Sequence, residues 1–374
     1  MAGRKKAVQE TSNAITLNTV IFKDMVTRAK KGAVNNSILP ITSMMAIELK
    51  DKKLTLTTTD TTNYLYVTQD NVEGPDFYVT VIADTFAALV SKTTSENITL
   101  ELKDNYLEVT GNGKYSIELP TEEGEIIKFP DPRNEVELSP LQDIKLSTIN
   151  SIISIAKPSL ATTMEEPVYT NYYCGERILT TDRYKICGMK ESLWEEPRLI
   201  SPQLMELVSL ITAEDIKVSA QDDIIMFSTP TCQVYGRTMP DIEDYEPEGI
   251  INALDTELGS SCRIKKQDLL QLLDRLSLFV AKNDNNEVYL TFTQDGLQLS
   301  SKASSGVETV KYVDMTNIVD FTCVIDIEMF TSEVKAMTED ILTICYGGEG
   351  TVIKFTEGST DIIVALLEDD RLAE

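Results

Sequence analysis

Short segments of alternating apolar and polar residues recur along the chain in pairs, and a few turn-forming residues separate the two members of each pair. This alternation has the two-residue period of a half-buried β-strand, so a turn between two such runs predicts a β-hairpin. Six hairpins are predicted, with turns at Asp51-Lys52, Asp104-Asn105, Gly175-Glu176, Asp222-Asp223, Asp295-Gly296 and Gly347-Gly348. Their spacing alternates between about 50 and about 70 residues, so every second hairpin recurs at roughly 120 residues and indicates an internal repeat.

A stretch with helical spacing of apolar residues lies ahead of each hairpin. The six stretches are Val20–Ala33, Ala83–Lys92, Ser147–Lys157, Ser201–Thr212, Lys266–Lys282 and Asp326–Met337. One more strand precedes each helix and another usually follows each hairpin, so the repeating unit is strand–helix–strand–strand–strand. Antiparallel hairpins with one helix per unit predict an α+β fold in which each helix covers one face of a sheet.

Pairs of these units predict three domains. We expect a flexible tail at residues 1–14 and domains at 15–133, 134–252 and 253–374, with the breaks in the segments PDPRNEVELS and PEGIINALDTELG. The alternative is a set of unrelated β-rich domains that share only turn statistics, and it does not explain why six units repeat the same order of elements.

Charge and composition narrow the classes of function. A net charge of −26 over 374 residues argues against a protein that binds nucleic acid with its whole surface, but it allows a local basic face. The absence of histidine removes Ser-His-Asp and Cys-His catalytic sets and the usual zinc sites. Six widely spaced cysteines, mostly inside apolar runs, are typical of small hydrophobic side chains in a reducing cytoplasm.

The sequence also bears on membranes and secretion. No segment approaches the roughly 18 consecutive apolar residues that span a bilayer. The N-terminus carries basic residues with no apolar stretch behind them, unlike a secretory signal. We therefore expect a cytoplasmic protein without membrane contact.

Two segments share a Thr-Thr-Asp sequence between apolar runs, namely LTLTTTDTTNYLYV at 54–67 and RILTTDRYKICGM at 177–189. After the aspartate, the first copy continues as Thr-Thr-Asn and the second as Arg-Tyr-Lys. We interpret the shared residues as scaffold of a duplicated unit. The altered residues are the better candidates for a function that only the second copy has.

This organisation resembles that of the bacterial DNA polymerase III beta subunit, the DNA sliding clamp. The segment NNSILPITSMMAIELKDKKLTLTTTD resembles the family's Leu-Pro-Ile run with the hairpin that follows it. LTTDRYKICGM resembles its Thr-Asp-Gly-His-Arg-Leu-Ala segment, and GRTMPDIEDYEP its Gly-x-Phe-Pro-Asp-Tyr segment. DLLQLLDRLSLFVAKNDNNEVYLTFTQDGLQLSS resembles a helix, strand and hairpin of its third domain. The resemblance spans about residues 15–368 and suggests a divergent member, such as one encoded by a bacteriophage.

The resemblance implies a head-to-tail homodimer that forms a ring of six domains, with helices lining a hole that holds double-stranded DNA. Such a clamp needs few base contacts and a modest number of cations facing phosphates. The residues expected to face DNA are Lys23, Arg28, Lys30, Lys31, Lys92, Lys157, Lys265, Lys266 and Lys335. Two basic residues that the family often has are replaced here, one by Asn35-Asn36 and the other by Glu166, which places those two DNA contacts in doubt.

The resemblance further implies an apolar pocket that binds short linear peptides of DNA polymerase, the clamp loader and repair proteins. The matching positions are Tyr169, Thr181, Arg183, Tyr184, Lys185, Ile186, Pro247, Ile251, Ile363, Val364 and Ala365. An apolar floor, a threonine hydroxyl and a basic rim suit a peptide with buried anchors and a polar or acidic flank. The family's Gly-His pair is Arg183-Tyr184 here and a large C-terminal residue is Ala365, so we expect partner peptides to differ.

The segment RLSLF at 275–279 looks like the family's partner peptide, but it continues a helical pattern. We therefore expect Leu278 and Phe279 to lie at the dimer interface that the resemblance implies, against Tyr115 and Ile117 of the partner subunit.

The sequence contains no recognisable catalytic set, so we expect no enzyme activity, no cofactor and no bound metal. Two other classes of function stay open. One is a clamp-fold platform that recruits transcription or repair proteins to DNA. The other is a carboxylate-dependent enzyme on the repeated α+β scaffold, with Asp241, Asp244 and Glu246 as its candidate residues.

Overall fold

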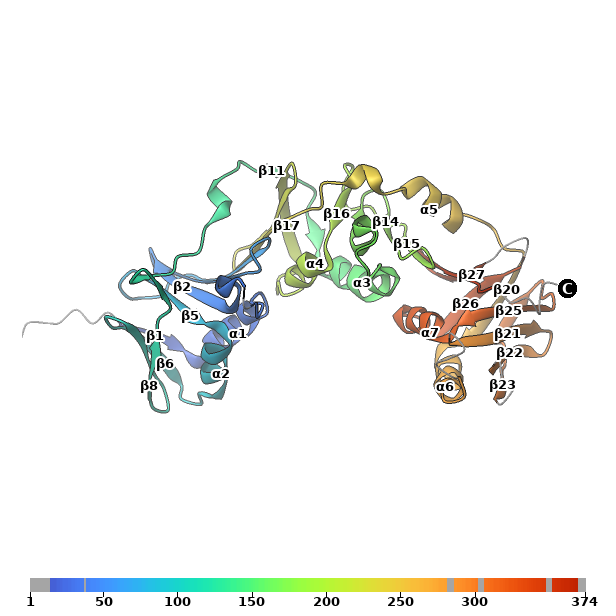
Figure 1. Ribbon diagram of the computed structural model, residues 1–374, viewed down its shortest axis with the longest axis horizontal. Helices are drawn as coiled ribbons and strands as arrows, with labels where there is room; N and C mark the ends of the chain where they lie inside the picture. Colours follow the sequence, from blue (N-terminus) through green and yellow to red (C-terminus); the bar gives the residue numbers. More distant parts are fainter. Residues whose placement is uncertain (1–13, 37, 281–285, 302–305, 348–351, 369–374) are drawn as a thin grey trace, which may run out of the picture. The chain divides into compact units, whose positions relative to one another are not determined.

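The computed structural model describes residues 14–36, 38–280, 286–301, 306–347 and 352–368 of the chain (Figure 1). The described chain divides into two compact units. The first contains the residues up to 146 together with 206–237, and the second contains 147–205 and the residues from 238 onward. All but one residue of the expected N-terminal tail lies outside the described ranges.

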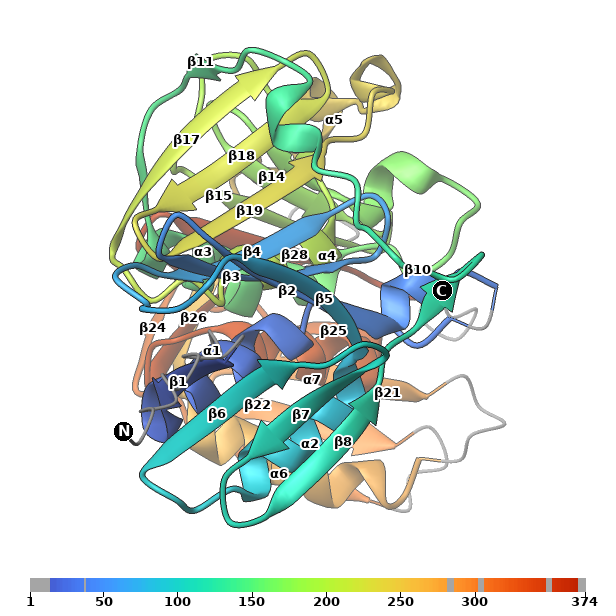
Figure 2. The same cartoon turned by 90° about the vertical axis from the view of Figure 1, so that its left-hand side faces the viewer.

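The first unit contains two helices and two main sheets (Figure 2). Its elements are β1 (Ala14–Asn18), α1 (Thr19–Lys30), η1 (Pro40–Ser43), β2 (Met44–Lys50), β3 (Lys53–Thr59), β4 (Tyr64–Gln69), β5 (Phe77–Ile82), α2 (Ala83–Lys92), β6 (Asn97–Leu102), β7 (Tyr106–Thr110), β8 (Lys114–Glu118), β9 (Thr121–Glu122), β10 (Glu125–Ile126), η2 (Pro132–Asn134), β11 (Ser139–Pro140), β12 (Ile144–Lys145), β17 (Asp215–Gln221), β18 (Ile224–Thr229) and β19 (Cys232–Arg237). The larger sheet runs β5–β2–β3–β4–β19–β18–β17–β11, with β12 also on β17, and the smaller runs β1–β6–β7–β8. The rings of Phe22 in α1 and Phe86 in α2 meet edge to face, with centroids 6.0 Å apart.

The second unit has the same two kinds of sheet. Its elements are α3 (Leu146–Ala156), η3 (Lys157–Ser159), η4 (Pro167–Thr170), β13 (Tyr172–Cys174), β14 (Ile178–Thr181), β15 (Lys185–Met189), β16 (Arg198–Ile200), η5 (Ile242–Asp244), α5 (Pro247–Leu254), β20 (Ser260–Lys265), α6 (Lys266–Ser277), β21 (Glu287–Thr293), β22 (Gly296–Ser301), β23 (Val307–Val310), β24 (Asp314–Thr316), β25 (Phe321–Asp326), α7 (Ile327–Ala336), β26 (Ile341–Tyr346), β27 (Val352–Glu357) and β28 (Thr360–Ala365). The larger sheet runs β16–β13–β14–β15–β28–β27–β26–β20–β24, and the smaller runs β23–β22–β21–β25. Helix α4 (Pro202–Val208) crosses from the second unit back into the first.

The order of these elements confirms the predicted repeat. Each of the six helices α1, α2, α3, α4, α6 and α7 follows one strand and precedes three, and each coincides within a few residues with a predicted stretch. All six hairpins pair as expected, although part of the last turn lies outside the described residues. The fold is therefore α+β with the predicted repeating unit, while the three domain boundaries stay a prediction.

Each of the larger sheets forms where two sets of four or more antiparallel strands meet. In the first unit, β4 pairs with β19 from Cys232↔Val67 to Tyr235↔Tyr64. In the second, β15 pairs with β28 from Lys185↔Val364 to Met189↔Thr360, and we call this pairing the β15–β28 seam. Each junction joins strands far apart in the sequence, and it removes two unpaired sheet edges at once.

The two Thr-Thr-Asp segments adopt the same hydrogen-bonded structure. The first threonine of each donates to the last turn of a helix, from Thr58 Oγ1 to the Ala29 carbonyl at 2.7 Å and from Thr180 Oγ1 to the Ala156 carbonyl at 2.9 Å. The second threonine donates to the carbonyl four residues on, and the aspartate accepts backbone N–H bonds from the residues two and three ahead. The residue after each aspartate has a positive φ, 82° in one copy and 75° in the other. The shared residues are therefore scaffold, as the sequence indicated.

Two further features bear on the sequence predictions. All six cysteines, which lie within the described ranges, are free thiols, and five of them are buried. Helix α5 was not predicted, because its sequence PEGIINAL begins with a proline and contains a glycine, and we assigned it to an interdomain linker.

Replacing the first threonine of either segment by valine should weaken the attachment of the strand to its helix. Thr58→Val and Thr180→Val each remove one buried hydrogen bond, which is worth about 1 kcal/mol. We expect both to lower the midpoint of urea unfolding. Thr62→Val is the matched control, because Thr62 is exposed and contributes its backbone N–H to the turn. Equal midpoints for Thr58→Val and Thr62→Val would contradict the scaffold role.

Candidate functional site

The residues expected to form the partner pocket converge on one apolar cluster in the second unit. Thr181 of β14 lies opposite Ile186 of β15, and Ile186 lies opposite Ile363 of β28, so the three form one row across the sheet. The cluster combines Ile363 and its neighbours with two buried residues of α5, Ile250 and Leu254. Tyr169, Ile186 and Ile251 pack on its surface, half-buried.

Helix α5 lies against the seam because β15 has a glycine at the point of approach (Figure 1). A Cβ built on Gly188 would come within 2.3 Å of Leu254 Cδ1. A larger residue at this position would force the Leu254 side chain to shift in its packing. The unpredicted helix therefore supplies one wall of the cluster.

Three tyrosines form the edge of the cluster. The rings of Tyr169 and Tyr245 meet edge to face at 5.2 Å, and those of Tyr173 and Tyr245 stack at 4.9 Å. Tyr245 is buried, whereas Tyr169 and Tyr173 are half-buried. From the sequence, Tyr245 was noted only as part of the segment GRTMPDIEDYEP. Its position before Pro247 gave no sign that it would join the pocket.

Alternation along the strands divides the predicted pocket residues between two faces of the sheet. Ile186 and Ile363 face α5, whereas Lys185 and Val364 are paired with each other in register and point to the opposite face, where both are buried. The hydroxyl of Thr181 donates to the Lys185 carbonyl at 2.8 Å and accepts from Arg183 N–H at 2.9 Å, so the turn uses both of its functions. Lys185 therefore does not form part of the expected basic rim, and the Thr181 hydroxyl is already engaged within the turn.

Lys185 forms a buried ionic cluster instead of a rim. Its Nζ lies 3.4 Å from Glu333 Oε1 of α7 and 3.4 Å from Asp182 Oδ2, and it donates to the Pro158 carbonyl. Glu333 is fully buried, and neither of its oxygens has a well-directed hydrogen bond. Burial raises the pKa of Glu333 to about 7, although the Lys185 ammonium favours the carboxylate. Lys185 thus holds α7 to the seam.

A polar cavity of about 300 Å³ adjoins the apolar cluster. Its lining includes Val168 and Tyr169, which also belong to the cluster, together with Arg183 and the carboxylates of Glu165, Glu166, Asp244 and Glu246. The Arg183 guanidinium pairs with Glu166 and lies 6.0 Å from the centre of the Tyr169 ring.

The remaining predicted pocket residues lie around this site. Tyr184 is 59% exposed, and its carbonyl accepts a hydrogen bond from Ala365 N–H at 2.8 Å across the seam. Pro247 begins α5 and is half-buried, as is Ala365.

With one exception, the cations expected to face DNA fall into two groups. Three are engaged within the protein. Arg28 pairs with Asp24 at 2.9 Å, Lys30 pairs with Asp84 at 2.9 Å, and Lys266 donates to the Lys335 and Met337 carbonyls at the end of α7. The Asn35 amide and the Lys30 ammonium together hold the pKa of Asp84 below its ordinary value. Asn35, which stands near the family's usual arginine position, thus has a structural contact.

The second group is available to a ligand. Lys23 is half-buried and Lys31, Lys92, Lys265 and Lys335 are exposed, and none of the five has an ion-pair partner in the described part of the chain. Lys157, directly after α3, is also exposed but already interacts with other groups of the protein, so it belongs to neither group.

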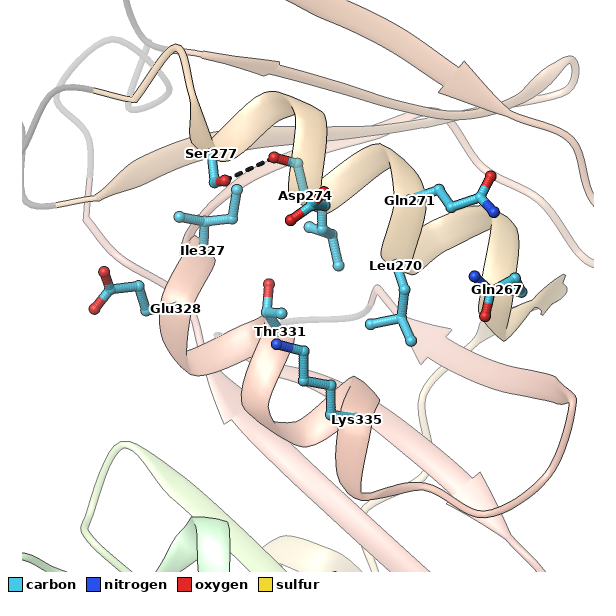
Figure 3. Close-up of a pocket in the computed structure, with 10 residues that line it drawn as sticks. Gln267, Leu270, Gln271, Asp274, Ser277, Ile327, Glu328, Thr331 and Lys335 are labelled. Carbon is cyan, nitrogen blue, oxygen red and sulfur yellow. Dashed lines mark hydrogen bonds between the residues drawn. The ribbon is translucent and has the colours of Figure 1, made fainter.

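Helices α6 and α7 enclose a groove of about 450 Å³ (Figure 3). Leu270 of α6 points toward Thr331 and Lys335 of α7, while Asp274 and Glu328 line the other end. The groove therefore presents one cation and two carboxylates, so only its Lys335 end suits a phosphate.

The residues expected at a dimer interface are accessible on the single chain. Tyr115 lies on β8 and is 47% exposed, and Ile117 on the same strand is half-buried. Leu278 and Phe279 follow α6 and are 80% and 53% exposed. Both β8 and β23 are outermost strands of their four-stranded sheets, and a Cβ built on Gly306, just before β23, would lie 3.4 Å from the Phe279 ring.

The buried pair predicts a pH-dependent double-mutant cycle. Lys185→Met leaves the Glu333 carboxylate buried without its cation and should cost about 3–5 kcal/mol of unfolding free energy at pH 8. Because the pKa of Glu333 is raised to about 7 in the folded protein, the folded chain keeps a proton on Glu333 at pH values where the unfolded chain has lost it. The contribution of protonated Glu333 to the unfolding free energy therefore falls as pH rises toward about 7. The loss in Lys185→Met should therefore be smaller at pH 5 than at pH 8.

The double variant Lys185→Met/Glu333→Leu removes both charges and should recover most of the lost stability. Urea unfolding of the two single variants and the double variant at both pH values measures the cycle. A double variant as unstable as Lys185→Met would show that the pair is not what holds α7.

Residues 14–128 match the family model of the DNA polymerase III beta subunit, N-terminal domain. The chain has no match among curated protein sequences.

The similarity of fold extends over nearly the whole chain. The beta chain of DNA polymerase III from Streptococcus pneumoniae superposes with a TM-score of 0.82 at 15% identity, covering 95% of this chain and 100% of that one. The beta subunit from Thermotoga maritima gives 0.81 at 17% identity, covering 95% and 99%. The sliding clamp from Bartonella birtlesii, bound to griselimycin, gives 0.82 at 13% identity, covering 95% and 100%. Residues 14–128 thus form an N-terminal domain of the DNA polymerase III beta subunit type, and the chain as a whole has the sliding-clamp fold, which confirms the resemblance expected from the sequence.

Proposed function

We propose that this protein is a DNA sliding clamp that encircles duplex DNA as a head-to-tail homodimer and tethers DNA polymerase and other replication proteins. The observation that carries the proposal is the clamp fold over 95% of the chain, at essentially the full length of the solved clamps. A processivity factor works by topology and needs no sequence readout. The low identity to those clamps is compatible with such a role, because few specific residues are required.

Cations on the helices support contact with DNA. Lys31, Lys92 and Lys265 are exposed and unpaired within the described ranges, and each lies at or next to the end of a helix of the repeat. The net charge of −26 would repel DNA from most of the surface. A modest number of phosphate contacts on an acidic body holds DNA without fixing it in one place.

Exposed sheet edges support the dimer. An outermost strand with free N–H and C=O groups is a template for pairing with another chain. Strands β8 and β23 are such edges, and apolar side chains accompany both, Tyr115 on the first and Phe279 beside the second. Pairing of β8 with β23 of a second copy would satisfy both edges and bury these side chains.

The apolar cluster at the β15–β28 seam supports partner tethering. It presents half-buried Tyr169, Ile186 and Ile251 at its surface. A short peptide with apolar anchors would cover these side chains.

Among the described residues, no group of three or more acidic or cysteine side chains is placed to hold a metal ion, and no helix is long and apolar enough to cross a membrane.

Retention on closed DNA tests the ring. After loading, the protein should stay on circular DNA but leave DNA that has been cut once. A closed circle has no end, whereas a ring can slide off the ends of a linear duplex. The double variant Leu278→Asp/Phe279→Asp should run at the mass of one chain and lose retention. Equal release from circular and linear DNA would overturn the ring.

Salt dependence tests the helix cations. The triple variant Lys31→Ala/Lys92→Ala/Lys265→Ala should bind a short duplex with a salt slope smaller by up to about 3, since each phosphate contact contributes about 0.9. Anisotropy titrations at several salt concentrations measure the slope. Lys266→Ala is the matched control, because its ammonium caps α7. It should lower the melting temperature and leave the slope unchanged. An unchanged slope in the triple variant would place the DNA elsewhere.

A further inference from the structure

The cavity beside the apolar cluster has a charge balance that bears on which peptide can bind there. Val168 and Tyr169 line the cavity and also belong to the cluster. A peptide whose anchors cover the cluster would therefore place a flanking residue over the cavity. The cavity, at about 300 Å³, has room for one long side chain.

The cavity is strongly acidic. Four carboxylates line it, those of Glu165, Glu166, Asp244 and Glu246, against the single guanidinium of Arg183. Glu165, Asp244 and Glu246 are exposed and have no cationic partner in the part of the chain that the structure describes. Burial and the carboxylates of Glu246 and Glu166 raise the pKa of the Tyr169 hydroxyl, as expected for a group in a negative field.

The two cations that could have offset this field are already engaged. Arg183 pairs with Glu166, and Lys185 is buried on the opposite face of the sheet with Glu333 and Asp182. Neither offers a free positive charge to an acidic ligand. An acidic flank would therefore meet three uncompensated carboxylates, whereas a cation would complement them.

From this complementarity, and given the partner-tethering function proposed above, we infer that the preferred partner is a peptide with a lysine or arginine directly flanking its apolar anchors. The flanking cation lies over the Tyr169 ring and pairs with Asp244 and Glu246. The aromatic face and the two carboxylates then act together on one positive charge. This differs from the polar or acidic flank expected from sequence, because that expectation treated Arg183 and Lys185 as a basic rim.

Five labelled peptides test the inference with the full-length protein. All carry the anchor Leu-Ser-Leu-Phe. Three peptides have Lys, Gln or Glu directly before the anchor. The other two have Gln before the anchor and Lys or Glu directly after it. One of the two lysine peptides should bind about tenfold more tightly than the glutamine peptide. The peptide with glutamate at that same position should bind more weakly than the glutamine peptide. The two lysine peptides have equal net charge, so a general attraction to an acidic protein would raise both affinities alike.

Variants locate the effect. Asp244→Asn/Glu246→Gln should abolish the preference for lysine over glutamine. Glu248→Gln is the matched control, because Glu248 is exposed on the same segment and does not line the cavity. It should retain the preference. Ile251→Asp, on the surface of the apolar cluster, should abolish binding of every peptide.

The outcomes separate the two proposals. Binding of all peptides with equal affinity, or tighter binding of a glutamate peptide, overturns the cationic flank and leaves partner tethering intact. Equal gains for both lysine peptides also overturn it, since the site would then contribute nothing beyond net charge. Absence of binding by every peptide at 100-fold excess overturns the tethering function itself.

Discussion

Pairing between edge strands is the interaction on which the rest of this structure depends. A small set of antiparallel strands leaves an open edge, and an open edge must be paired or protected. The chain solves this by pairing β4 with β19 and β15 with β28, so that separate repeats become continuous sheets. The β15–β28 seam then fixes everything near it. It sets the row of Thr181, Ile186 and Ile363, it creates the flat face that α5 covers, and it brings Glu333 within reach of Lys185.

The repeat could be predicted from sequence because its signals are local. Alternation, turn residues and helical spacing each act over a few residues, and all six units appear in the structure as expected. Helix α5 was missed because proline and glycine dominated a short segment whose stability comes from packing on Gly188 and not from its own propensity.

The candidate site was harder to predict, since its chemistry depends on partners distant in sequence. Ile186, Ile251, Ile363 and Tyr169 were named and do meet. Lys185 was predicted to lie at the rim because nothing near position 185 reveals the carboxylate of Glu333 on α7. Alternation along the strand does place Lys185 and Ile186 on opposite faces of the sheet, so the two residues could not both line one pocket. The same limit applied to Lys266 and Lys30, whose partners lie on other helices. Counting cations therefore overestimates the positive surface that remains for a ligand.

The two Thr-Thr-Asp turns have a consequence for how such a protein can change. In both copies the aspartate accepts from backbone N–H groups and the threonines donate to backbone carbonyls, so these bonds do not involve the first two side chains after the aspartate. The third side chain does contact the aspartate, since the Asn63 amide donates to Asp60 at 2.9 Å and the Lys185 ammonium lies 3.4 Å from Asp182. The residues at 61–62 and 183–184 can therefore be exchanged without remodelling the loop, as the Thr-Thr and Arg-Tyr pairs of the two copies indicate. Inherited variation can then change the side chains exposed beside the seam through one or two codons, while the architecture that presents them is passed on intact.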